Sequence, residues 1–179
     1  MTPDTLDAAV AQVADVMVDA RRDLEALVRI PSISASPAHA DAVQQSANAT
    51  AAALEKYGLE NVRLASAGGS PPYVIGNYLH AGDAPTVLLY AHHDVQPPGV
   101  EARWSSPPFE PVERDGRLYG RGSADDKAGA VAHAAAVAAW LRSGNAPPCN
   151  VRILIEGEEE IASPHLAAFL AEQADALRS

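Results

Sequence analysis

An apolar run leads directly into polar side chains in the stretch Thr86-Val87-Leu88-Leu89-Tyr90-Ala91-His92-His93-Asp94-Val95-Gln96-Pro97. Apolar residues on consecutive positions, as in residues 86–91, are typical of a strand buried on both faces of a mostly parallel sheet. The polar side chains begin where this strand is predicted to end. Because ligand sites in open α/β sheets lie at the carboxyl ends of strands, the stretch indicates a fold class and also the place of a site.

Helical and extended patterns alternate around this stretch. Apolar residues at helical spacing predict helices over residues 5–28, 38–57 and 126–141, and Ser163 is predicted to cap a last helix that runs to Leu177. Further strands are predicted over residues 62–65, 73–79 and 150–155. Residues 92–124 carry turn residues and are predicted as a long loop with short extended pieces. The alternation predicts an α/β fold, a three-layer α/β/α sandwich with a mostly parallel central sheet.

Composition narrows the classes of function. The 179 residues are 47% hydrophobic and 20% charged, which is typical of one globular domain. A formal net charge of −10 argues against a nucleic-acid partner. The apolar runs are too short to span a bilayer, so no membrane partner is expected. The first residues lack the features of a secretory signal, so we expect a cytoplasmic protein.

Cysteine usage limits the possible metal ligands. Cys149 is the single cysteine, so it can neither form an internal disulfide nor supply a cluster of thiolates. Any metal ion would therefore be held by histidine, aspartate and glutamate.

Such residues gather in three segments that each follow a predicted strand or a glycine-rich turn. The segments are residues 90–97, residues 120–127 and residues 156–163. Together they offer imidazole and carboxylate ligands, which zinc accepts, and a spare carboxylate for proton transfer. This combination predicts a metal-dependent hydrolytic site.

The three segments resemble the M20 family of di-zinc metallopeptidases, and within it the dipeptidase branch related to carnosinases. The shared motifs are His-x-Asp-Val-Gln-Pro, Gly-Arg-Gly-x-x-Asp-Asp-Lys and Glu-Glu-x-x-Ser, in that order. Each motif alone is weak, but the ordered set is highly specific. The resemblance runs from Leu27 to the end of the third motif.

The resemblance implies two zinc ions per site, with Co²⁺ or Mn²⁺ as substitutes, and roles for five residues. His92 and Glu160 would each ligate one ion, and Asp125 would bridge the two. Asp94 would orient His92 from behind. Glu159 would be the general base that takes a proton from water and delivers it to the leaving amine.

Some features depart from the family pattern. Ala128 and Ala162 stand where glycine is common, which is tolerable unless the backbone needs a positive φ. The family also takes a carboxylate ligand shortly after the third motif and a histidine ligand from near its C-terminus, and it inserts a lid or dimerisation domain. We therefore expect residues 1–179 to be the N-terminal part of one M20-type catalytic domain, a fragment without the lid through which intact members often form homodimers.

The expected activity of the parent enzyme is metal-dependent hydrolysis of dipeptides or related amide bonds, and the isolated chain is expected to be inactive for lack of ligands. Because the family also includes deacylases and desuccinylases, the resemblance implies a small peptide or an N-acyl amino acid as the substrate. Gln96 followed by Pro97 favours the dipeptidase branch. A non-catalytic truncated remnant is the alternative from another class.

Several of these residues also have a purely structural interpretation. The acidic triplet at residues 158–160 is also typical of a solvated turn before a helix. His93 is expected to be structural, because neighbouring strand residues face opposite sides. Asp126 is interpreted as a charge at a helix N-terminus. Residues 120–122 lack the Gly-Lys-Ser/Thr element of a phosphate loop, so that interpretation is rejected.

Overall fold

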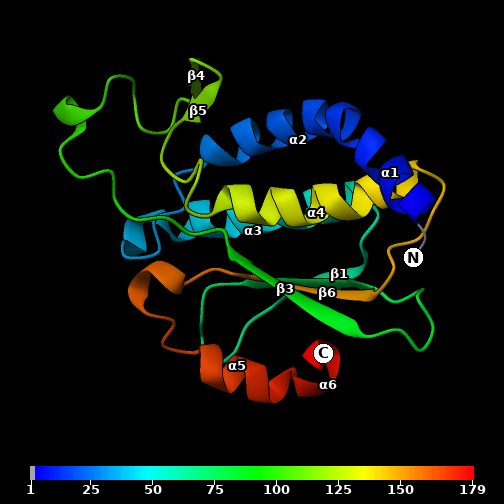
Figure 1. Ribbon diagram of the computed structural model, residues 1–179. Coiled ribbons are helices and arrows are strands. Elements are labelled where there is room, and N and C mark those ends of the chain that lie inside the picture. The colour runs from blue at the N-terminus through cyan, green and yellow to red at the C-terminus, as the bar shows by residue number, and fades with distance from the viewer. Residues whose placement is uncertain (1–2) are drawn as a thin grey trace.

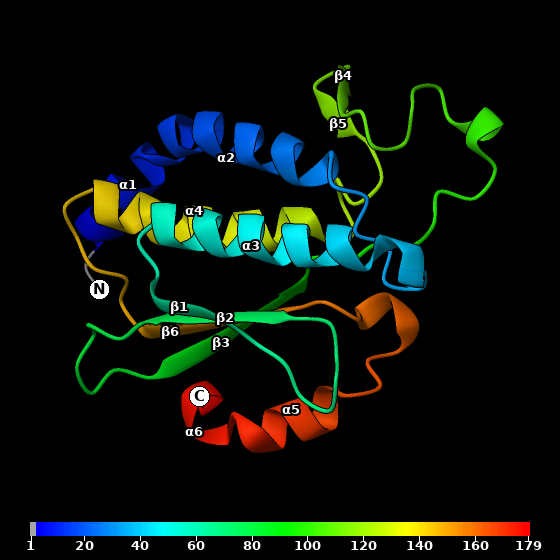
Figure 2. The ribbon, with the colours of Figure 1, turned by 180° about the vertical axis from the view of Figure 1, so that it is seen from behind.

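The computed structural model describes residues 3–179 and has a four-stranded sheet between two layers of helices (Figure 1). One layer holds α1 (Pro3–Ala11), α2 (Val13–Val28), α3 (Ala40–Lys56) and α4 (Lys127–Arg142). The other holds α5 (Leu166–Glu172) and α6 (Ala174–Leu177), which cover the opposite face (Figure 2). The predicted three-layer α/β/α sandwich is confirmed.

The sheet is mixed, so the prediction of a mostly parallel sheet was wrong. Its order is β1 (Glu60–Ala65), β2 (Tyr73–Tyr78), β6 (Asn150–Glu156), β3 (Thr86–His92). Only β3 and β6 run parallel, whereas β1–β2 and β2–β6 are antiparallel. The physical reason is the length of the connections: residues 66–72 form a short reversal between β1 and β2, while α4 lies in the long crossover from β3 to β6.

The strand β3 lies at the edge of the sheet, and the prediction that it is buried on both faces was wrong. In the described part of the chain β3 pairs only with β6, and Val87 and Tyr90 are 38% and 43% exposed. By contrast, β6 lies between β2 and β3 and is almost entirely buried. Apolar content indicates a strand but does not indicate how many neighbours the strand has.

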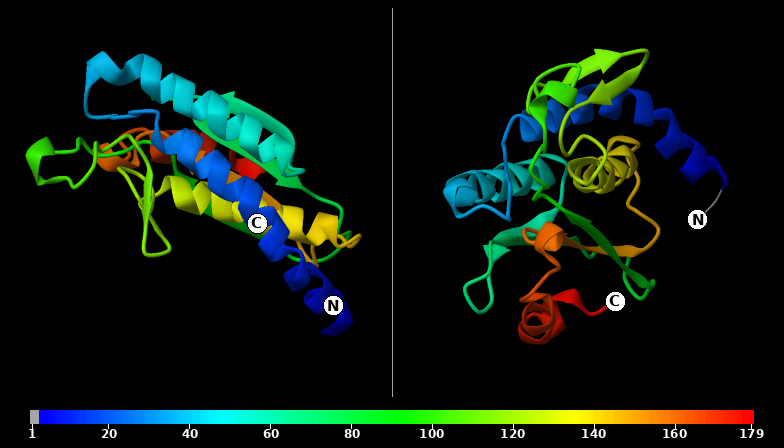
Figure 3. Two further views of the ribbon diagram at one scale, coloured as in Figure 1. Left: turned by 90° about the horizontal axis from the view of Figure 1, so that it is seen from above. Right: turned by 90° about the vertical axis from the view of Figure 1, so that its left-hand side faces the viewer.

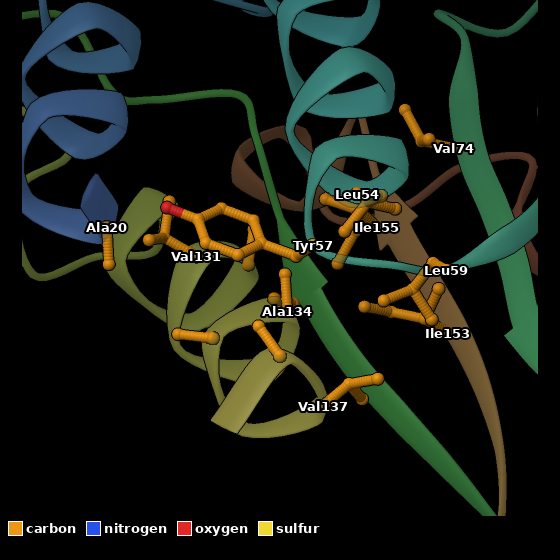
Figure 4. Packing of buried hydrophobic residues seen from close by; sticks show 14 of the residues in the cluster. Ala20, Leu54, Tyr57, Leu59, Val74, Val131, Ala134, Val137, Ile153 and Ile155 are labelled. Atoms are coloured by element: carbon orange, nitrogen blue, oxygen red, sulfur yellow. The ribbon is translucent and has the colours of Figure 1, made fainter. Parts of the chain in front are cut away.

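The core divides between the two faces of the sheet. On the face of α3 and α4, Leu54 and Tyr57 pack with Val131, Ala134 and Val137 and with Ile153 and Ile155 of β6 (Figure 4). On the other face Leu154 packs with Tyr73 and Phe169, whose rings stack with centroids 4.0 Å apart. The alternation of Ile153, Leu154 and Ile155 between the two clusters is the two-residue period of a strand covered on both sides.

A buried lysine joins the start of α4 to the end of α2. Lys127 is fully buried, and its Nζ donates to the carbonyl oxygens of Leu27 and Ile30, each at 2.7 Å. Burial lowers the pKa of Lys127 to about 7, against the opposing attraction of Asp94. The Lys127 side chain therefore fixes the end of α2 and the residues just after it, which lie 100 and 97 positions before Lys127 in the chain.

Two predicted helices begin or continue differently. Residues 5–28 form α1 and α2 rather than one helix, because a tight turn at Gln12, whose N–H bonds to the Ala9 carbonyl, separates them. Ser163 does not cap the last helix: Ala162 and Ser163 have φ of 67° and 50°, and α5 begins at Leu166. None of the helices within residues 3–179 is long and apolar enough to cross a membrane.

The predicted long loop contains short regular pieces. They are the 3-10 turn η2 (Glu101–Arg103) and a hairpin of β4 (Val112–Arg114) with β5 (Arg117–Tyr119). The part around η2 projects from the layers (Figure 3), and the hairpin lies beside α2, where Glu113 of β4 pairs with Arg21 of the helix at 2.6 Å. This segment returns to the sheet at the start of α4, which carries the second polar motif.

Replacing Lys127 with methionine should remove the donor from two buried carbonyl groups. We expect the free energy of unfolding to fall by about 2–4 kcal/mol, measured by urea denaturation. Lys56→Met is the matched control, because Lys56 pairs with Asp23 at an exposed place and should lose less than about 1 kcal/mol. Equal losses in both variants would contradict the structural role given to Lys127.

Ala162 and Ala128 should respond oppositely to replacement by glycine. Ala162 has the left-handed φ that an L-residue adopts at a cost, so Ala162→Gly should raise stability by up to about 1 kcal/mol. Ala128 lies inside α4, so Ala128→Gly should lower stability by about 0.5–1 kcal/mol. Thermal melts of both variants would test this, and a loss in both would contradict it.

Candidate metal centre

The three polar segments meet at one edge of the sheet. Because β3 and β6 are parallel and His92 is paired with Glu156, both strands end at this edge. The residues after β3 therefore lie beside the turn η3 (Glu159–Ile161), which follows β6. The start of α4 brings the second motif to the same place.

Three predicted ligands come together there. His92, Asp125 and Glu160 each offer one ligand atom, and these atoms lie within 4.8 Å of one another. His92 Nε2 is 3.1 Å from Asp125 Oδ1, and the imidazole is buried while the Asp125 side chain is 74% exposed. One imidazole and two carboxylates facing a common point suit zinc or a similar divalent cation, so this donor set fits a metal ion.

The buried carboxylate of Asp94 connects the residues of the site through hydrogen bonds. Ser34 Oγ donates to Asp94 Oδ2 at 2.5 Å, and the backbone N–H groups of Glu159 and Glu160 donate to the two carboxylate oxygens at 3.2 and 3.1 Å. His92 Nδ1 lies 3.4 Å from Asp94 Oδ1 and 3.1 Å from the Asp94 carbonyl oxygen. With Nδ1 engaged in this way, the Nε2 of His92 points toward Asp125.

These contacts shift the pKa values of both partners. Burial alone would lower the pKa of His92, but the hydrogen bond and negative charge of Asp94 raise it to about 9. Burial alone would raise the pKa of Asp94, but hydrogen bonds from His92, Ser34 and the Glu160 N–H hold it below its usual range. In the metal-free protein Asp94 is therefore ionised and His92 is protonated at neutral pH.

The neighbouring histidine has the opposite character. His93 is fully buried, its Nε2 lies 2.9 Å from the Pro72 carbonyl oxygen, and burial lowers its pKa to about 4. Its ring is therefore neutral and faces away from His92. This agrees with the structural role predicted for it.

The carboxylate of Glu159 lies beside the predicted ligands but is less constrained. Its Oε2 is 3.7 Å from His92 Nε2, and its side chain is 44% exposed. A carboxylate at the edge of the cluster, open to solvent, is able to exchange a proton with water and with a bound molecule. All five residues predicted for the site are thus gathered at this edge of the sheet.

The second aspartate of the 125–126 pair has a separate place. The Asp125–Asp126 peptide bond is cis. Asp126 caps α4, and its carboxylate accepts the Gly129 N–H at 3.1 Å. This agrees with its interpretation as a charge at a helix N-terminus.

The prediction from sequence missed a buried network under the acidic triplet. Glu158 is fully buried and accepts hydrogen bonds from Tyr73 Oη at 2.6 Å and from the His165 N–H at 2.9 Å, and His165 Nδ1 lies 2.9 Å from it. A Cβ on Gly157 would lie 2.5 Å from the Pro72 carbonyl oxygen, so this turn requires glycine. Three adjacent glutamates look alike in sequence, and no pattern separates the buried one.

Two further residues at the site were also missed as site residues. Ser34 lies in the loop after α2 and reaches Asp94, and Gln96 lies just after β3 and reaches Glu160. Both act through hydrogen bonds across loops, which have no periodic pattern in the sequence.

Comparison with known proteins agrees with this geometry. Residues 88–178, just over half of the chain, match the model of peptidase family M20/M25/M40. The chain is 36% identical over 140 residues to the cysteinylglycine-S-conjugate dipeptidase of Corynebacterium striatum, an alignment covering 78% of the chain and 30% of that relative. It is 45% identical over 75 residues to the succinyl-diaminopimelate desuccinylase of Acidovorax ebreus, which covers 42% of the chain and 19% of the relative.

Among solved structures, human carnosine dipeptidase 1 superposes with a TM-score of 0.84 at 27% identity, covering 96% of the chain and 38% of that protein. The chain thus spans less than half of the length of each of these proteins. The match to the family model and the shared fold lead to one conclusion: the chain belongs to peptidase family M20/M25/M40.

Proposed function

We propose that this chain forms part of a metal-dependent hydrolase that cleaves dipeptides. The observation that carries the proposal is the meeting of His92, Asp125 and Glu160 within 4.8 Å at the carboxyl edge of the sheet. The family implies a divalent metal, and relatives named as dipeptidases support the substrate class. We further propose that the metal is zinc and that the complete site holds two ions.

In this proposal His92, Asp125 and Glu160 would hold the metal. When bound, the metal would act as a Lewis acid that activates water and polarises the scissile carbonyl group. Asp94 keeps the imidazole of His92 oriented through Nδ1. Glu159 accepts the proton of the attacking water and donates it to the departing amine, which its open position beside His92 Nε2 supports.

The ligand count limits what these residues do alone. Two zinc ions with about four ligands each need more protein ligands than the three side chains gathered within residues 3–179. We therefore propose that the 179-residue chain by itself binds metal weakly and does not turn over substrate. A second candidate, hydrolysis of N-succinyl amino acids, is favoured by the identity to a desuccinylase.

Metal analysis of the chelator-stripped and zinc-reloaded protein tests the ligand set. We expect the wild type to bind zinc weakly and Glu160→Ala to lose that binding, because the variant removes one of three ligands. Glu172→Ala, an exposed glutamate of α5, is the matched control and should bind like the wild type. Equal zinc content in all three proteins would contradict the assignment.

Hydrolysis assays on the same proteins should use cysteinylglycine and an N-succinyl amino acid. We expect no turnover by the 179-residue chain. Turnover that disappears in Glu159→Gln and Glu160→Ala would contradict the expected inactivity and support the roles of both residues. The preferred substrate would then decide between the dipeptidase and the desuccinylase.

The protonation of His92 sets the pH dependence of metal binding. Metal binding requires a neutral imidazole, and the raised pKa keeps the proton on His92 up to about pH 9. The apparent zinc affinity should therefore rise by about tenfold per pH unit from pH 7 to pH 9. Imidazole NMR of the metal-free protein should show His92 titrating near 9 and His93 near 4.

The variant Asp94→Asn checks the cause of that shift. Without the carboxylate charge, burial dominates, and the pKa of His92 should fall toward or below its ordinary value of 6.5. An unchanged titration of His92 in this variant would show that Asp94 does not control the imidazole.

A further inference from the structure

Gln96 makes two contacts with one predicted ligand. Its Nε2 donates to the carbonyl oxygen of Glu160 at 2.7 Å and to Glu160 Oε2 at 2.9 Å. Gln96 itself is exposed, so burial does not explain its placement. The side-chain amide thus bridges the backbone and the carboxylate of a single residue.

Glu160 is thereby held at three atoms. Asp94 Oδ2 accepts its N–H at 3.1 Å, while Gln96 donates to its carbonyl oxygen and to Oε2. Asp94 and Gln96 are two positions apart in the extended segment after β3, where alternate side chains lie on one side. Asp94 and Gln96 therefore hold Glu160 of the turn η3 at its N–H, its carbonyl oxygen and its carboxylate.

The side-chain amide of Gln96 is a suitable hydrogen-bond partner for a glutamate that ligates a metal ion. Glutamate has three rotatable side-chain bonds, and a donor at Oε2 restricts them before any cation binds. The amide adds no positive charge, whereas a lysine or arginine at this position would repel a divalent cation. The amide donates to Oε2 and not to Oε1, so Gln96 engages only one of the two carboxylate oxygens.

The adjacent carboxylate, that of Glu159, has different contacts. Glu159 Oε2 lies 3.7 Å from His92 Nε2, whereas Glu160 Oε2 accepts a hydrogen bond from Gln96; both glutamates are half-buried. A fixed carboxylate suits a ligand, and a more mobile one suits proton transfer between two sites. The two neighbouring glutamates are therefore distinguished by the contact with Gln96.

We propose that Gln96 is a positioning residue: it fixes Glu160 as a metal ligand and leaves Glu159 free to carry a proton. The metal part of this inference rests on the function proposed above. The fixing of Glu160 does not, because the hydrogen bonds exist in the metal-free protein.

The first test therefore needs no metal. Side-chain ¹³C relaxation of the metal-free protein should show the Glu160 γ-methylene more ordered than that of Glu159. In Gln96→Ala the order of Glu160 should fall to the level of Glu159, and in Gln45→Ala, an exposed glutamine of α3, it should stay unchanged. Unchanged order of Glu160 in Gln96→Ala would overturn the proposal.

The second test measures zinc affinity by competition with a chromophoric chelator. We expect Gln96→Ala to weaken zinc binding by about tenfold, as is typical when a group that orients a ligand is removed. Gln96→Met keeps the size of the side chain but has no donor, so it should bind zinc like Gln96→Ala. Zinc affinity of Gln96→Met equal to that of the wild type would overturn the role of the hydrogen bond.

The two tests separate this inference from the proposed function. If the wild-type protein and Glu160→Ala bind zinc equally well, the metal assignment of Glu160 is wrong. The relaxation measurement still decides whether Gln96 fixes Glu160.

Discussion

The carboxylate of Asp94 is the interaction on which the candidate site depends. It is fully buried, and it joins the loop after α2, the end of β3 and the turn after β6 through Ser34, His92 and the backbone of Glu159 and Glu160. A buried negative charge is tolerated only when donors surround it. Removing any one of the three segments would leave that charge less well compensated, so the site and the local fold are stabilised together.

Much of the site could be predicted because its residues stand at positions that the fold class defines. His92 and the acidic triplet each follow a strand, and a helical crossover makes those strands parallel, so their carboxyl ends meet. Asp125 precedes a helix that begins at the same edge. The resemblance to a known family then suggested roles, but the meeting of the residues follows from topology.

The other features of the fold and the site could not be predicted from the sequence, because they depend on contacts between residues far apart in the chain rather than on a local sequence pattern. Residues 86–91 indicated a strand, but their edge position follows from the antiparallel course of β1 and β2. Lys127 belongs to the second polar motif, yet its side chain binds two carbonyl oxygens of the chain near the end of α2. Glu158 is indistinguishable in sequence from Glu159, and only its contacts with Tyr73 and His165 give it a separate role.

The long separations in sequence have a consequence for the order of folding. The contacts of Asp94 with the turn after β6 close a loop of 66 residues, and those of Lys127 close one of 100. Loop closure has an entropic cost that must be met before such contacts stabilise the chain, so structures of high contact order fold slowly. The residues of the candidate metal centre therefore come together only when β3 and β6 have paired, so their assembly is expected late in folding rather than in an early nucleus.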